Sequence, residues 1–125
     1  MTNPFRGELQ VNLGGKSYKT RITVEGCMQI EGACGMSLVK LATRLSEGEL
    51  TISDVANIIT PAMRGGGNNT DIPAVAKMVY EAGLTEGLRV AAELLSNVLM
   101  GGTDLGDSDG GTEKNDEPTL LAQSS

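Results

Sequence analysis

Residues 7–24, GELQVNLGGKSYKTRITV, contain the pattern that decides the fold class of this chain. Leu9, Val11 and Leu13 alternate with polar residues, which is the period of a half-buried β-strand. The Gly14–Gly15 pair follows and offers two residues that accept positive φ, as a two-residue type I′ turn requires. The stretch therefore predicts a β-hairpin near the N-terminus.

The two-residue loop also predicts the register of the hairpin, because the turn fixes which residues face each other. The apolar residues of both strands then share one face of the hairpin. An isolated hairpin is only marginally stable in water, so we expect helices to cover that face. The expected pairs are Leu13 with Lys16, Val11 with Tyr18 and Leu9 with Thr20.

After residue 24 the apolar residues recur at helical spacing in short segments, most of them bounded by a capping residue and a glycine. We expect the first helix to run to about Cys34, and the stripe from Leu88 to Leu99 to be the strongest. The predicted fold class is α+β, an N-terminal β-hairpin followed by four to five short amphipathic α-helices. The expected N-caps are Thr23, Ser37, Thr51 with Asp54 in a capping box, Thr70 or Asp71, and Thr85; the expected ends are Gly35, Gly48, Gly83 and Gly101–Gly102.

A proline lies within the third helical segment, and a run of glycines follows that segment. Pro61 falls inside the segment and is expected to kink or divide the helix. The run RGGGNN at residues 64–69 superficially resembles a phosphate-binding loop. It lacks the Gly-Lys-Ser/Thr ending of such loops, and no buried strand precedes it. We therefore interpret the glycine run as a flexible connector.

The charged residues divide the chain into two parts. Residues 1–100 hold nine basic and ten acidic side chains, whereas residues 101–125 hold one lysine and six acidic side chains. A nearly neutral body lacks the basic surface by which proteins bind nucleic acids, so no nucleic-acid partner is expected. We predict a hairpin-plus-helices domain over residues 1–102. Residues 103–125 are predicted to be a disordered acidic tail, because few apolar groups there offset the entropy of ordering.

The chain has few residues suited to catalysis or metal binding, with no histidine and only two cysteines. Cys27 and Cys34 lie about 10 Å apart along one predicted helix, which is too far for a disulfide bond, and we expect buried, reduced thiols. Glu25, Glu31 and Glu81 are interpreted as exposed charges on helix faces. We therefore expect no catalytic residue, no cofactor and no metal site, and predict that the protein is not an enzyme.

The N-terminal sequence and the distribution of apolar residues bear on location. MTNPFRGELQ has no basic region followed by an apolar run, so no signal peptide is expected. No stretch approaches about 18 apolar residues, so we expect no membrane span and no membrane partner. The predicted location is the cytoplasm.

Several short motifs follow one another in a specific order: NPFRGE at residues 3–8, GGKSY at 14–18, Ser37-Leu38 with residues 41–48, MRGGG at 63–67, and AGL at 82–84. Their order and spacing resemble the gene-transfer-agent tail protein family, whose members are encoded among the tail genes of gene transfer agents and related siphophages. The resemblance covers roughly residues 3–102. Pro61 and the acidic tail depart from the shared pattern.

The resemblance implies a tail assembly chaperone, although some members of the family are labelled tail tube proteins. Such a chaperone binds the long tape-measure protein and helps to recruit tail tube subunits. The expected partners are therefore the tape-measure protein and the major tail protein, and self-association stays open. A chaperone of this kind acts in the cytoplasm of the bacterial host cell and is absent from the finished particle.

Two other classes of function stay open at this point. The first alternative is a structural tail component, either a tube protein or a minor tail protein. The second and weaker alternative is a small ligand-binding protein or enzyme. Five short helices on one small hairpin leave little room to bury every apolar face, which favours an apolar docking groove. The candidate partner-binding residues are Met63, Met78 and Leu84.

Overall fold

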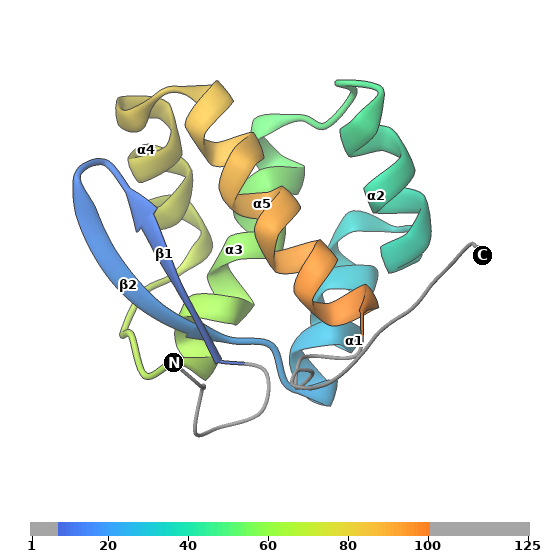
Figure 1. The fold of residues 1–125 in the computed structure, drawn as a ribbon, viewed down its shortest axis with the longest axis horizontal. Coiled ribbons are helices and arrows are strands. Elements are labelled where there is room, and N and C mark those ends of the chain that lie inside the picture. Colours follow the sequence, from blue (N-terminus) through green and yellow to red (C-terminus); the bar gives the residue numbers. More distant parts are fainter. Residues whose placement is uncertain (1–7, 101–125) are drawn as a thin grey trace, which may run out of the picture.

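A computed structural model describes residues 8–100 of the chain and places a two-stranded antiparallel hairpin beside five helices (Figure 1). The predicted α+β class is confirmed. The predicted tail over residues 103–125 lies outside the described residues. The elements are β1 (Glu8–Leu13), β2 (Lys16–Arg21), α1 (Val24–Cys34), α2 (Leu38–Ser46), α3 (Ile52–Gly65), α4 (Ile72–Ala82) and α5 (Leu84–Leu99).

The hairpin has the register that the Gly-Gly turn predicts. Gly14 and Gly15 both have positive φ, of 63° and 81°, which a two-residue turn needs. Leu13 pairs with Lys16, Val11 with Tyr18 and Leu9 with Thr20. The side chains of this face are turned toward the helices, and Val11, Leu13 and Thr20 are buried. The Thr20 hydroxyl satisfies its hydrogen-bonding need by donating to the Leu9 carbonyl at 2.6 Å.

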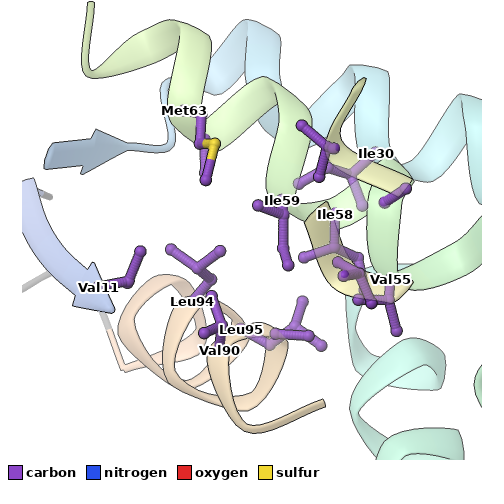
Figure 2. Packing of buried hydrophobic residues seen from close by; sticks show 14 of the residues in the cluster. Val11, Ile30, Val55, Ile58, Ile59, Met63, Val90, Leu94 and Leu95 are labelled. Atoms are coloured by element: carbon purple, nitrogen blue, oxygen red, sulfur yellow. The ribbon is translucent and has the colours of Figure 1, made fainter. Parts of the chain in front are cut away.

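Helix α3 forms the centre of the fold, because it packs against α1, α4, α5 and β2. Its buried residues recur at helical spacing and meet the buried stripe of α5 (Figure 2). Burying one such side chain contributes roughly 1.5–3 kcal/mol relative to leaving it exposed. The core residues labelled in Figure 2 are Val11 of β1, Ile30 of α1, Val55, Ile58, Ile59 and Met63 of α3, and Val90, Leu94 and Leu95 of α5.

Most helix boundaries follow from side-chain caps at the predicted positions. Thr23, Ser37 and Asp71 each accept a hydrogen bond from a backbone N–H in the first turn of their helix. Thr51 and Asp54 form the predicted capping box. The named caps therefore account for the starts of the first four helices.

The predicted cap of the last helix, Thr85, is wrong. Helix α5 begins two residues earlier than a Thr85 cap would place it, at Leu84, and Gly83 is its N-cap without any side-chain hydrogen bond. Gly83 also ends α4, with φ of 103°. One glycine serves both helices because a positive φ turns the chain within a single residue.

The interpretation of the glycine run as a flexible connector is wrong for its first two residues. Gly65 is the last residue of α3, and Gly66 is its C-cap. A Cβ atom on Gly65 would overlap the carbonyl of Arg21, and one on Gly66 would overlap the carbonyl of Lys19. The absence of side chains here lets the end of α3 approach the backbone of β2 closely.

Pro61 does not divide the third helix, which runs without interruption from Ile52 to Gly65. Proline removes one helical hydrogen bond, so its position within a helix has to be stabilised by packing. The neighbours of Pro61 in α3, Thr60 and Ala62, are fully buried. Tertiary contacts of α3 with four other elements therefore outweigh the local preference to break the helix.

Candidate partner-binding surface

The three residues proposed from the sequence do not form one groove. Met63 is only 1% exposed and packs in the core between α3 and its neighbours (Figure 2). It is not available to a partner in this fold, because its position on α3 faces the hairpin and α5 rather than solvent. Met78 is half-buried on α4, and Leu84 is 38% exposed as the first residue of α5. Met78 and Leu84 therefore stay candidates, at two separate places.

Met78 lines a pocket of about 240 Å³ between α4 and the tip of the hairpin. The apolar part of its wall comes from Leu13, Tyr18 and Ala82, and the charged part from Lys16 and Glu81. Such a wall accommodates a small apolar side chain beside a polar group.

Two side chains of α5 fix the hairpin tip in place. The carboxylate of Glu86 accepts a hydrogen bond from the Gly14 N–H at 3.3 Å. Arg89 donates from Nη2 to the Asn12 carbonyl at 3.1 Å and from Nη1 to Glu93 at 3.1 Å. The pocket wall contributed by the hairpin is therefore held relative to α5.

Parts of both edges of the hairpin are engaged by other segments of the chain. On the β2 edge, Asn68 donates from Nδ2 to the Lys19 carbonyl at 2.7 Å, while Gly65 lies against the Arg21 carbonyl. On the β1 edge, Arg89 donates a hydrogen bond to the Asn12 carbonyl. An added β-strand binds through such outward carbonyls and N–H groups. Three of these groups are thus already paired or covered.

An apolar row lies along the exposed side of α4, and Leu84 at the start of α5 adds a further exposed apolar side chain. Ile72, Ala76 and Tyr80 are spaced by four residues, so they share one face of α4, and Leu84 follows at the start of α5. Ile72, Tyr80 and Leu84 are exposed, Tyr80 by 76%. We call Ile72, Ala76, Tyr80 and Leu84 the α4 row. The sequence interpretation missed Tyr80, because the adjacent stripe that begins at Val75 is equally regular and is the one that folding buries.

Helix α1 also exposes apolar side chains. Val24 and Met28 are one helical turn apart and mostly exposed, while Ile30 is the buried anchor of this helix. Two glycines, Gly26 and Gly32, lie within α1. Gly26 is buried where α1 meets Pro61 of α3. Helix α1 therefore offers a second, smaller apolar surface.

The structure does not gather the three carboxylates named from the sequence. Glu31 accepts a hydrogen bond from the Leu38 N–H at 3.1 Å and thus caps the start of α2. Glu25 lies on α1 and Glu81 on α4, and these two helices do not pack against each other. Within residues 8–100 no group of three or more His, Cys, Asp and Glu side chains is placed to hold a metal ion.

Both cysteines are free and half-buried, rather than fully buried as expected. Burial raises the pKa of the Cys34 thiol to about 11, and the nearby Asp54 carboxylate adds to this effect. Burial, followed by the charge of Glu31, also raises the pKa of Cys27. A thiol with a raised pKa is protonated near neutral pH and is a poor nucleophile.

A comparison with protein families identifies the chain. Residues 6–101 match the family described as phage tail tube protein, GTA-gp10. The chain belongs to this family. Comparisons with curated proteins and with solved structures gave no significant match.

The GTA-gp10 match spans the hairpin, all five helices, the pocket and the α4 row, and it ends where the acidic segment begins. Membership places the chain among phage and gene-transfer-agent tail proteins, whose natural partners are other tail proteins. No helix among residues 8–100 has the length and apolar character needed to cross a membrane.

Proposed function

We propose that this member of the GTA-gp10 family is a tail assembly chaperone that binds the tape-measure protein and helps to recruit tail tube subunits. One observation carries the proposal. The two strands of residues 8–100 form a single hairpin whose outward carbonyls at Lys19, Arg21 and Asn12 are engaged by Asn68, Gly65 and Arg89. A tube wall built by pairing strands between subunits needs open strand edges. A sheet of only two strands, with both edges partly engaged, favours a helper over a wall subunit.

The α4 row supplies the proposed docking surface. An amphipathic helix binds a partner through side chains spaced at i, i+4 and i+8, which is the spacing of Ile72, Ala76 and Tyr80. A tape-measure protein offers long helical segments with apolar stripes, which such a row fits. Met78, in the neighbouring pocket, adds a flexible side chain that adapts to different partner surfaces.

The description of the family as tail tube protein favours a second candidate function, a structural tail component. The two roles differ in where the protein ends up. A chaperone acts in the host cytoplasm and is absent from finished particles, whereas a tube component is present in many copies. Neither role requires an enzymatic activity.

Co-expression with the tape-measure protein of the same genome tests the chaperone role. We expect the full-length chain to keep that partner soluble and to co-purify with it. Tyr80→Glu and Leu84→Glu should each weaken the complex, because each places a charge in the apolar α4 row. Lys77→Glu is the matched control, since it introduces the same side chain at an exposed polar position of α4. It should leave the complex intact.

Mass spectrometry of purified particles separates the two candidates. Absence of the chain from particles, together with the complex, supports the chaperone. Many copies per particle without tape-measure binding would overturn the chaperone proposal in favour of the structural one. Circular dichroism of each variant establishes that a lost complex reflects a lost surface rather than a lost fold.

A further inference from the structure

We propose that the basic outward face of β2 binds the acidic C-terminal segment of the same chain. The segment is residues 104–117, which hold six of the acidic side chains of the chain and one lysine. The face consists of Lys19 and Arg21 of β2 with Arg64 at the end of α3, and we call these three residues the basic face. This inference does not depend on the proposed function.

The basic face arises from the alternation of side chains along β2. Tyr18 and Thr20 point toward the helices, so Lys19 and Arg21 point to the opposite side, where both are exposed. Arg64 is exposed and lies nearby, because Gly65, the next residue, packs against the Arg21 carbonyl. The Arg64 Nε atom donates a hydrogen bond to the Thr70 carbonyl at 2.8 Å, and this bond restrains the side chain.

These three cations have no ionic partner among residues 8–100, where the ion pairs involve Arg44 and Arg89 instead. Glu8 faces Arg21 across the hairpin and reduces the local charge. Residues 8–21 hold three basic side chains and Glu8, whereas residues 22–100 hold five basic and nine acidic side chains, so the hairpin is net positive and the rest of the body net negative. A surface with unpaired cations attracts an acidic chain, most strongly at low ionic strength.

The acidic segment is within reach of this face. Helix α5 starts beside the hairpin tip, where Glu86 meets Gly14, and runs from there across α3 (Figure 1). Residues 101–125 follow directly, and an extended chain of that length spans at most about 80 Å. Six residues of strand cover only about 20 Å.

Covalent attachment favours the chain's own segment over other acidic occupants. A short flexible connection holds a tethered segment at an effective concentration in the millimolar range. Several weak ion pairs then suffice for occupancy, although each is screened by salt. The proposed occupant is therefore an acidic peptide, and the contact is electrostatic rather than apolar.

Paramagnetic broadening in the full-length protein tests the proposal. A nitroxide label is placed at Ser108→Cys, between Asp107 and Asp109, in a background with Cys27→Ser and Cys34→Ser. We expect selective broadening of the backbone amides of β2 compared with those of α2. The broadening should disappear when the ionic strength rises from about 0.01 M to about 1 M, because the Debye length falls from about 30 Å to about 3 Å.

Charge variants identify the contacting residues. Lys19→Glu combined with Arg21→Glu should abolish the selective broadening. Both side chains are exposed, and the contacts with Asn68 and Gly65 involve the backbone carbonyls of these two residues, so the fold should be kept. Lys40→Glu combined with Lys77→Glu changes the net charge equally at exposed helix positions and should retain the broadening.

A second set of variants leaves the body untouched. Asp104→Asn, Asp107→Asn and Asp109→Asn together should also abolish the broadening. Equal broadening of β2 and α2, or broadening that survives in the Lys19→Glu/Arg21→Glu protein, would overturn the proposal. So would broadening that appears only between a labelled copy and a separate ¹⁵N-labelled copy, since the occupant would then be a second molecule.

Discussion

Gly66 lies where the end of α3 meets the backbone of β2, and it leaves no room for a side chain. We predict that Gly66→Ala destabilises the protein by roughly 1–3 kcal/mol, because a Cβ atom forces the Lys19 carbonyl away and disturbs its bond with Asn68. Gly32→Ala is the matched control. Gly32 is exposed inside α1 with no neighbour near its missing Cβ, so alanine should stabilise by about 0.5–1 kcal/mol. Chemical denaturation measures both changes, and equal effects would contradict this assignment.

Thr60, also at the residue scale, is a polar residue buried at a position where an apolar side chain should make the fold more stable. It is almost fully buried on α3, and its hydroxyl has no hydrogen-bond partner among the described residues. We predict that Thr60→Val, which nearly preserves the shape, stabilises the fold by about 1 kcal/mol by removing an unpaired polar group. Thermal unfolding of the purified variant checks the sign. A lower melting temperature would show that the hydroxyl has a partner.

At the scale of elements, Arg89 is one of the two α5 side chains that attach the hairpin tip, the other being Glu86. This side chain donates to the Asn12 carbonyl and also pairs with Glu93. We predict that Arg89→Ala destabilises by about 1–2 kcal/mol and speeds amide exchange in the hairpin more than in α3, because the tip is released locally. Glu93→Ala removes only an exposed i,i+4 pair and should cost about 0.3–0.5 kcal/mol. Hydrogen exchange that rises equally everywhere in Arg89→Ala would contradict a local role.

At the scale of the whole molecule, residues 103–125 should add little to folding. The segment has few apolar groups, and its proposed contact with the basic face is electrostatic and screened. We predict that truncation after Gly102 changes the melting temperature by less than about 5 °C, the shift that corresponds to about 1 kcal/mol for a domain of this size. A larger drop in differential scanning calorimetry would mean that the segment packs against the core.

Local patterns alone predicted the hairpin, its register and most of the helix boundaries. These features depend on groups close together in the chain. The Gly14–Gly15 turn sets which residues pair, and Thr23, Ser37 and Asp71 bond to backbone groups within one helical turn. Family membership was also accessible, because it rests on the order of short motifs along the chain.

The surface available to a partner was decided only by the tertiary structure. The periodicity of α3 and α4 marks apolar stripes without saying which ones the fold buries, so the buried Met63 stands among the candidate partner-binding residues and the exposed Tyr80 does not. The role of Gly65 and Gly66 likewise depends on β2, which lies more than 40 residues earlier in the chain. Contacts between distant segments fix which side chains meet solvent, and no local pattern contains that information.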